Sequence, residues 1–146
     1  MTPNLHESHS SLWRVFLTAY TTITEKIERD LATADLPPLT WYDVLWTLEQ
    51  APEHRLRLHE LAEKILLSRS NLTRLLDRLE TAGLICRERC PNDRRGAYAV
   101  LTEAGIAMRQ RMWPFYAEGI SKYFTAHLSP EEVTVMHQAL ERVLKV

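Results

Sequence analysis

The sequence of 146 residues has few of the features that mark disulfide-rich or membrane-spanning proteins. It contains only two cysteines, Cys86 and Cys90, which excludes a disulfide framework. No apolar run approaches the roughly 18 residues of a membrane-spanning helix. The N-terminal segment MTPNLHESHSS has no apolar signal-peptide core. We therefore expect a single-domain protein of the cytoplasm, long enough to bury a core.

Motifs for catalysis and metal binding are also missing from the sequence. It has no glycine-rich phosphate loop and no nucleophile elbow. Its histidines and cysteines follow neither the His-x-x-x-His nor the Cys-x-x-Cys spacing of metal sites. The sequence thus gives no positive reason to expect an enzyme, a cofactor or a metal ion.

The formal net charge of −1 conceals a segregation of charge along the chain. From Arg55 to Gly96 there are ten Lys and Arg against six Asp and Glu, a local balance of +4. The remainder has eight against thirteen, a balance of −5. A basic middle between acidic ends favours an anionic partner, and nucleic acid is the leading candidate.

Apolar periodicity predicts a mainly helical chain with one short β-hairpin. Pro37 and Pro38 end the first helix, and Gly83 ends the fourth. The expected helices span 10–33, 40–51 with Thr40 as N-cap, 58–65, 68–82 with Ser68 as N-cap, 102 onward with a bend at Pro114, and 130 onward after the capping residue Ser129. The expected strands span 84–90 and 97–101.

The expected helix over 68–82 has two contrasting faces. Its leucines form one apolar stripe, whereas the opposite face holds Ser70, Asn71, Arg74, Asp77, Arg78 and Thr81. Arginine can bond guanine, asparagine suits adenine, and hydroxyls hold phosphates or base edges, so this face suits a DNA major groove. A solvated surface helix shows a similar pattern. The short helix before it and the Arg-tipped hairpin after it favour DNA binding, because that order forms a recurring DNA-binding unit.

Two sequence blocks carry a resemblance to a known family. The segment LHELAEKILLSRSNLTRLLDRLETAGLI, followed by ERCPNDRRGAYAVLTEAG, closely resembles the winged helix-turn-helix of the MarR family of bacterial transcriptional regulators. The family hallmark is represented by Asp93, Arg95, Leu101-Thr102 and Gly105. The resemblance covers essentially the whole chain. It implies one domain over 1–146, with a reading head over 40–101 and dimerisation helices over 10–33 and 103–146.

The resemblance also implies which residues contact DNA. It makes Ser68 to Arg78 the recognition helix and Asp93 to Gly96 the tip of the wing. Arg95 would enter the minor groove, oriented by Asp93, and Arg94 would touch phosphate. The predicted DNA-binding residues are Ser68, Arg69, Ser70, Asn71, Thr73, Arg74, Arg78, Asp93, Arg94 and Arg95.

Two positions depart from the family pattern. Leu66 stands where relatives often have glycine in the turn between the two helices, which predicts a turn of different conformation or with strain. Leu58 and His59 replace the usual Ser or Thr cap of the preceding helix. Neither change removes a predicted DNA contact.

The terminal helices carry many aromatic and apolar residues, which a second copy of the chain would cover. We therefore expect a homodimer that presents two heads to a pseudo-palindromic site; the alternative is a larger monomer core. The resemblance further implies a repressor relieved by a small aromatic or phenolic ligand. The residues predicted to line its site are Trp13, Trp41, Tyr42 and Asp43; the alternative is that aromatic residues at this helical spacing simply belong to the core.

Two other functions remain open at this point. One is a winged-helix module that binds proteins and has lost DNA binding. The other is a regulator that senses oxidants through Cys86 and Cys90, although residues four apart on an extended strand lie roughly 13 Å apart. A disulfide needs Cα atoms within about 7 Å, so these two cysteines cannot bridge each other on such a strand.

Overall fold

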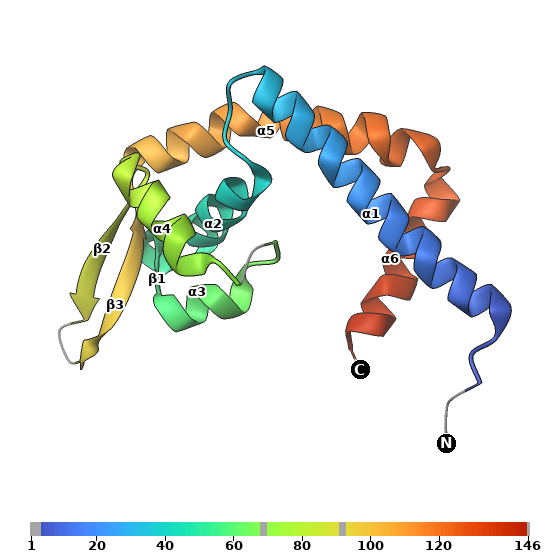
Figure 1. The fold of residues 1–146 in the computed structure, drawn as a ribbon, viewed down its shortest axis with the longest axis horizontal. Coiled ribbons are helices and arrows are strands. Elements are labelled where there is room, and N and C mark those ends of the chain that lie inside the picture. The colour runs from blue at the N-terminus through green and yellow to red at the C-terminus, as the bar shows by residue number, and fades with distance from the viewer. Residues whose placement is uncertain (1–3, 68–69, 91–92, 146) are drawn as a thin grey trace. The chain divides into compact units, whose positions relative to one another are not determined.

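The computed structural model describes residues 4–67, 70–90 and 93–145, without the side chains of residues 90 and 93–95. Its elements in chain order are α1 (Glu7–Thr33), α2 (Leu39–Gln50), η1 (Pro52–His54), β1 (Arg55–Arg57), α3 (Leu58–Lys64), α4 (Leu72–Thr81), β2 (Ile85–Cys90), β3 (Asp93–Leu101), α5 (Glu103–Tyr123), η2 (Thr125–His127) and α6 (Pro130–Leu144) (Figure 1). The prediction of a mainly helical chain with a small β-hairpin is confirmed. The chain divides into two compact units, Leu31–Pro114 and the pair Met1–Asp30 with Phe115–Val146.

The unit Leu31–Pro114 packs three helices against a small sheet. Strands β1, β3 and β2 lie side by side in that order, and both pairs are antiparallel. Helix α2 contacts α3, α4 and β3, whereas α4 contacts β2 (Figure 1). Apolar side chains from all these elements form one core, comprising Val44, Leu45, Leu48, Ala51, Leu56, Leu61, Ile65, Leu75, Leu76, Leu79, Leu84, Ile85, Ala99 and Leu101.

Strand β1 was missed by the sequence analysis, which treated this segment as a polar connection. It is three residues long, and Leu56 pairs with Ala99 of β3 in the antiparallel register. Leu56 is buried between two more exposed arginines. A run of three residues is too short for its alternation to stand out as a strand pattern.

Two helix starts differ from their predicted positions. Helix α2 begins at Leu39, because the carbonyl of Pro38 already accepts the N–H of Trp41 at 3.0 Å. Thr40 therefore lies inside the first turn and is not the N-cap. Helix α4 begins at Leu72, because Asn71 has non-helical dihedral angles while its carbonyl accepts the first helical bond. Helix α4 is thus shorter at its N-terminal end than predicted.

Thr102 joins the end of the hairpin to α5, as its position in the sequence predicts. Its hydroxyl donates to the carbonyl of Gly83 at 2.7 Å and accepts the N–H of Gly105 at 3.0 Å. A Cβ atom at Gly105 would lie 2.2 Å from the carbonyl oxygen of Leu84. Only glycine fits this close approach, so Gly105 allows α5 to start directly beside Leu84. Helix α5 then continues through Pro114 to Tyr123.

The other unit contains most of α1, the second half of α5, and α6. The Tyr123 hydroxyl donates to Asp30 Oδ2 at 2.6 Å, and this hydrogen bond raises the pKa of the Tyr123 phenol above its ordinary value. The predicted cap of α6 is confirmed, because Ser129 Oγ accepts the N–H of Glu132 while the Glu132 carboxylate accepts the N–H of Ser129. None of the helices described is long and apolar enough to cross a membrane.

Candidate nucleic-acid interface

Helix α4 has the two faces that its sequence predicts. Leu75, Leu76 and Leu79 are buried in the core of the unit. The opposite face is exposed and presents Asn71, Thr73, Arg74, Asp77 and Arg78. Burial of the leucine stripe therefore holds the polar face toward solvent.

Arg87 on β2 pairs with both acidic residues of α4 and offsets part of their negative charge. Its Nη2 atom donates to Asp77 Oδ1, and its Nε lies 3.9 Å from Glu80 Oε1. The backbone N–H of Arg87 also donates to Glu80 Oε2 at 2.9 Å. Within the described part of the chain, Arg74 and Arg78 make no such ion pair. The exposed face of α4 therefore keeps a net positive charge, which the sequence alone does not reveal.

A second ion pair lies on the sheet beside the hairpin. Arg55 Nη1 donates to Glu88 Oε2 at 3.1 Å, and the Arg55 guanidinium lies 4.4 Å from the centroid of the Tyr98 ring. Exposed pairs of this kind contribute only about 0–1 kcal/mol each to stability. The larger effect of the Arg55–Glu88 pair is to offset the negative charge of Glu88 on the hairpin.

The hairpin that the family resemblance makes a wing is formed by β2 and β3. Residues Asp93 to Gly96, expected at the tip, belong to strand β3, so this strand starts earlier than the predicted 97–101. Cys86 and Cys90 lie on β2, as expected for a strand. The predicted contacts Asp93, Arg94 and Arg95 have side chains that the structure does not describe. The predicted contacts Ser68 and Arg69 lie outside the described residues.

The turn between α3 and α4 differs from a glycine turn. Among the described residues other than glycine, only Asp35, Glu53 and His54 have left-handed dihedral angles, so Leu66 carries no such strain. At the start of α3, Glu60 Oε1 accepts the N–H of Arg57 at 3.0 Å. This bond satisfies a helix-start donor where a Ser or Thr cap is missing.

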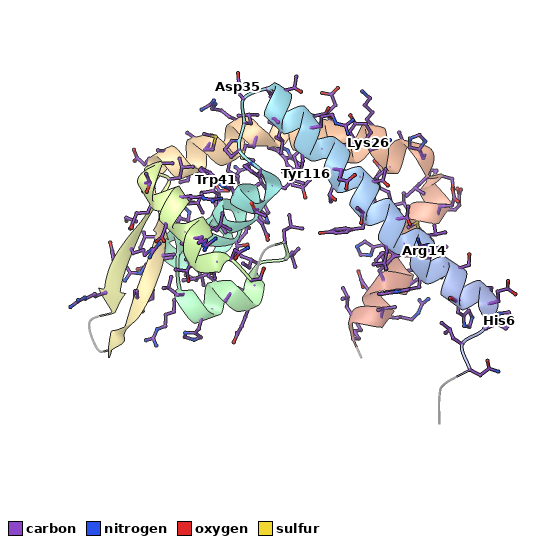
Figure 2. The ribbon with its side chains drawn as sticks, viewed as in Figure 1. His6, Arg14, Lys26, Asp35, Trp41 and Tyr116 are labelled. Atoms are coloured by element: carbon purple, nitrogen blue, oxygen red, sulfur yellow. The ribbon has the colours of Figure 1, made fainter. Side chains whose placement is uncertain are left out.

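Three of the four residues predicted to line an effector site are consecutive on α2. Trp41 is half-buried against the core, and Figure 2 labels it. Tyr42 is buried, and its ring centroid lies 6.4 Å from that of Trp46 and 6.1 Å from that of Trp113. Asp43 accepts two backbone hydrogen bonds from the turn before α4. Trp13 is exposed on α1, in the other unit. Trp46 and Trp113 were not predicted.

Helices α3 and α4 followed by the β2–β3 hairpin define a winged helix-turn-helix. The sequence profile of the MarR family matches residues 38–96, which include this unit. The regulator MhqR of Bacillus subtilis is 31% identical over 94% of this chain and 92% of its own length. The chain belongs to the MarR family and is therefore a transcriptional regulator.

Solved structures of MarR family regulators share the whole fold. AbsC of Streptomyces coelicolor is 31% identical, with a TM-score of 0.85 over 99% of this chain and 97% of that one. Sco3205 of the same organism, solved in complex with DNA, is 29% identical, with a TM-score of 0.88 over 99% of this chain and 91% of that one. The similarity thus extends beyond the 38–96 segment to the terminal helices.

Proposed function

We propose that the chain is a homodimeric repressor that binds a pseudo-palindromic DNA duplex through α4 and the hairpin of each copy. The observation that carries this proposal is the exposed polar face of α4, where Arg74 and Arg78 form no ion pair among the described residues while Arg87 pairs with the neighbouring carboxylates. Arginine forks and amide groups on such a face suit the major groove. The similarity to Sco3205, which was solved with DNA, supports this assignment.

The wing is proposed to contact the minor groove and the phosphates. Arg94 and Arg95 lie at the start of β3, next to the segment that joins the two strands. A narrow minor groove concentrates negative potential, so an arginine at this point adds affinity without base-specific bonds. The proposed DNA-binding residues are those predicted from the sequence, including Ser68, Arg69, Ser70, Asn71 and Thr73.

The homodimer is proposed from the exposure of α1 and α6. Every residue of α1 from Glu7 to Thr22 is exposed, among them the apolar side chains of Leu12, Trp13 and Phe16. Helix α6 has no buried residue, although it contains several valines and leucines. Isolated helices without a buried face are marginal in water, so these faces need a cover. A second copy of the chain, related by a twofold axis, provides it.

We further propose that a small aromatic ligand relieves repression. The exposed rings of Trp46 and Trp113 stack on buried Tyr42, and this arrangement suits a flat apolar ligand. Trp41, also on α2, packs against the core of the same unit. A ligand can shift the protein between states only if it binds one state more tightly than the other.

The first test is selection of bound duplexes from a random pool, followed by a salt titration. We expect an inverted repeat whose half-sites lie one helical turn apart, about 10–10.5 base pairs, or a multiple of it. The logarithm of the binding constant should fall linearly with the logarithm of salt concentration, by roughly 0.9 per phosphate neutralised. Absence of any preferred duplex, together with salt-independent binding, would favour the protein-interaction module. Repeating the measurement with phenolic compounds tests the ligand.

Replacing Arg95 with alanine is expected to weaken binding to all duplexes. A hydrogen bond to a charged group contributes about 1.5–3 kcal/mol, and the binding free energy should become less favourable by a similar amount. Any sequence preference of the effect should be confined to A·T-rich flanks. The matched control is Arg111→Ala, which removes the same charge from an exposed position on α5 of the same unit. Equal affinities for Arg95→Ala and Arg111→Ala would show that the wing does not enter the groove.

A further inference from the structure

The turn after α3 leaves backbone donors that its own helix does not satisfy. Helix α3 ends at Lys64, and Ile65 is already extended, with φ −69° and ψ 148°. The N–H of Ile65 still donates to the carbonyl of Leu61, but the N–H groups of Leu66 and Leu67 do not continue the helical hydrogen-bond pattern. A glycine in the left-handed conformation would direct such groups back to the last carbonyls of the helix. Leu66 does not adopt that conformation.

Asp43 on α2 accepts both of these donors. Its Oδ2 atom lies 2.7 Å from the nitrogen of Leu66 and 2.8 Å from that of Leu67. These bonds join residues more than twenty positions apart in the sequence. Because the carboxylate is charged, they are shorter and stronger than bonds between neutral groups.

The carboxylate of Asp43 has a rigid support. It projects from the middle of α2, where the next two residues, Val44 and Leu45, are fully buried in the core. Side chains in such a core are closely packed and hold a fixed position. The two N–H groups are therefore fixed relative to the core, although the side chain of Leu66 itself is 81% exposed.

We infer that Asp43 is a positioning residue for DNA reading: its carboxylate satisfies the backbone donors that follow α3 and holds Leu66 and Leu67, in the turn before α4, against α2. This inference rests on the proposed function, because it assumes that α4 reads the duplex. Asp43 itself touches no DNA in this arrangement. Its effect is on the direction in which Asn71 and Arg74 are presented.

The first measurement is amide hydrogen exchange at Leu66 and Leu67 in the protein without DNA. In Asp43→Ala both amides should exchange at least about tenfold faster, since a hydrogen bond to a charged group is lost. Asp43→Asn keeps an uncharged acceptor, so its exchange rates should lie between those of the wild type and those of Asp43→Ala. Thr47→Val is the control, because the Thr47 hydroxyl donates to the backbone carbonyl of Asp43, at 2.6 Å, and not to its carboxylate. Unchanged exchange in Asp43→Ala would overturn the inference.

The second measurement is the ratio of affinities for the duplex selected by the wild-type chain and for a scrambled duplex of equal length. We expect Asp43→Ala to lower this ratio about tenfold while binding to the scrambled duplex changes little, because the wing and the helix charges remain. Loss of folded protein alone would instead lower both affinities equally. Adding Leu66→Gly to Asp43→Ala should restore part of the ratio, since glycine permits the left-handed turn.

The two proposals can fail separately. If the wild-type chain prefers no duplex, the proposed function is wrong and the role of Asp43 falls with it. If the wild-type chain discriminates and Asp43→Ala discriminates equally well, only the positioning role is wrong. Should Asp43→Ala fail to fold, Asp43→Asn must lower the ratio by itself for the inference to stand.

Discussion

Replacing Leu79 with alanine is expected to lower the free energy of unfolding by about 2–5 kcal/mol. Leu79 is 0% exposed and lies in the core formed by the helices and the sheet of its unit. Truncation leaves a cavity among close-packed side chains, and that cavity adds to the lost transfer free energy. Denaturant unfolding at a fixed protein concentration measures the change.

The control for this change is Leu66→Ala, which removes the same atoms from a side chain that is 81% exposed. It should alter the free energy of unfolding by no more than about 0.5 kcal/mol. If Leu79→Ala also changed stability by less than that, α4 would not be anchored by its leucine stripe. Small domains are stable by only about 5–15 kcal/mol, so Leu79→Ala should also leave less protein competent to bind DNA.

Replacing Arg74 with alanine is expected to remove about 1–3 kcal/mol of discrimination at one base pair. Arg74 is exposed on α4 and makes no ion pair within the residues described, so its guanidinium is available for a bidentate bond to guanine. The measurement is the affinity for a set of duplexes, each with one base pair of the selected site changed. At one position, a changed base pair should no longer lower the affinity of Arg74→Ala. At the other positions, the loss of affinity should match that of the wild type.

Arg74→Lys separates charge from geometry in this experiment. Lysine keeps the positive charge but lacks the planar fork that bonds two acceptors of one base. We expect it to retain the salt dependence of the wild type and to lose most of the discrimination. A uniform drop in affinity for all duplexes in Arg74→Ala would place Arg74 on a phosphate instead.

The sequence predicts those elements whose signals are local. The cap of α6 is readable because Ser129 and Glu132 are three residues apart, and the leucine stripe of α4 follows the helical period. Strand β1 has no such signal, since three residues cannot show a period. The start of α2 was misplaced because Thr40 is a residue type that often caps helices. The N-cap is instead Pro38, whose carbonyl accepts the N–H of Trp41.

The parts of the interface that sequence reasoning missed depend on contacts between elements. Arg87 and Asp77 belong to different elements, and nothing in their spacing of ten residues indicates an ion pair. Asp43 was predicted to be the one acid among the aromatic residues of a ligand site. Its two hydrogen bonds to the turn after α3 arise only when the helices pack.

In the proposed homodimer, the residues of α1 from Glu7 to Thr22, which are exposed in the single chain, would be covered by the second copy. In a separate protomer the C-terminal part of α1 keeps its own contacts, because Ile27 is buried and Asp30 is bonded to Tyr123. The segment from Glu7 to Thr22 has no buried residue there, and isolated helices gain little stability from propensity alone. Folding of this exposed segment and association of the two proposed protomers would then be one equilibrium, whose position follows the protein concentration. Dilution should therefore lower the helical content, and unassembled chains should be the first that cellular proteases remove.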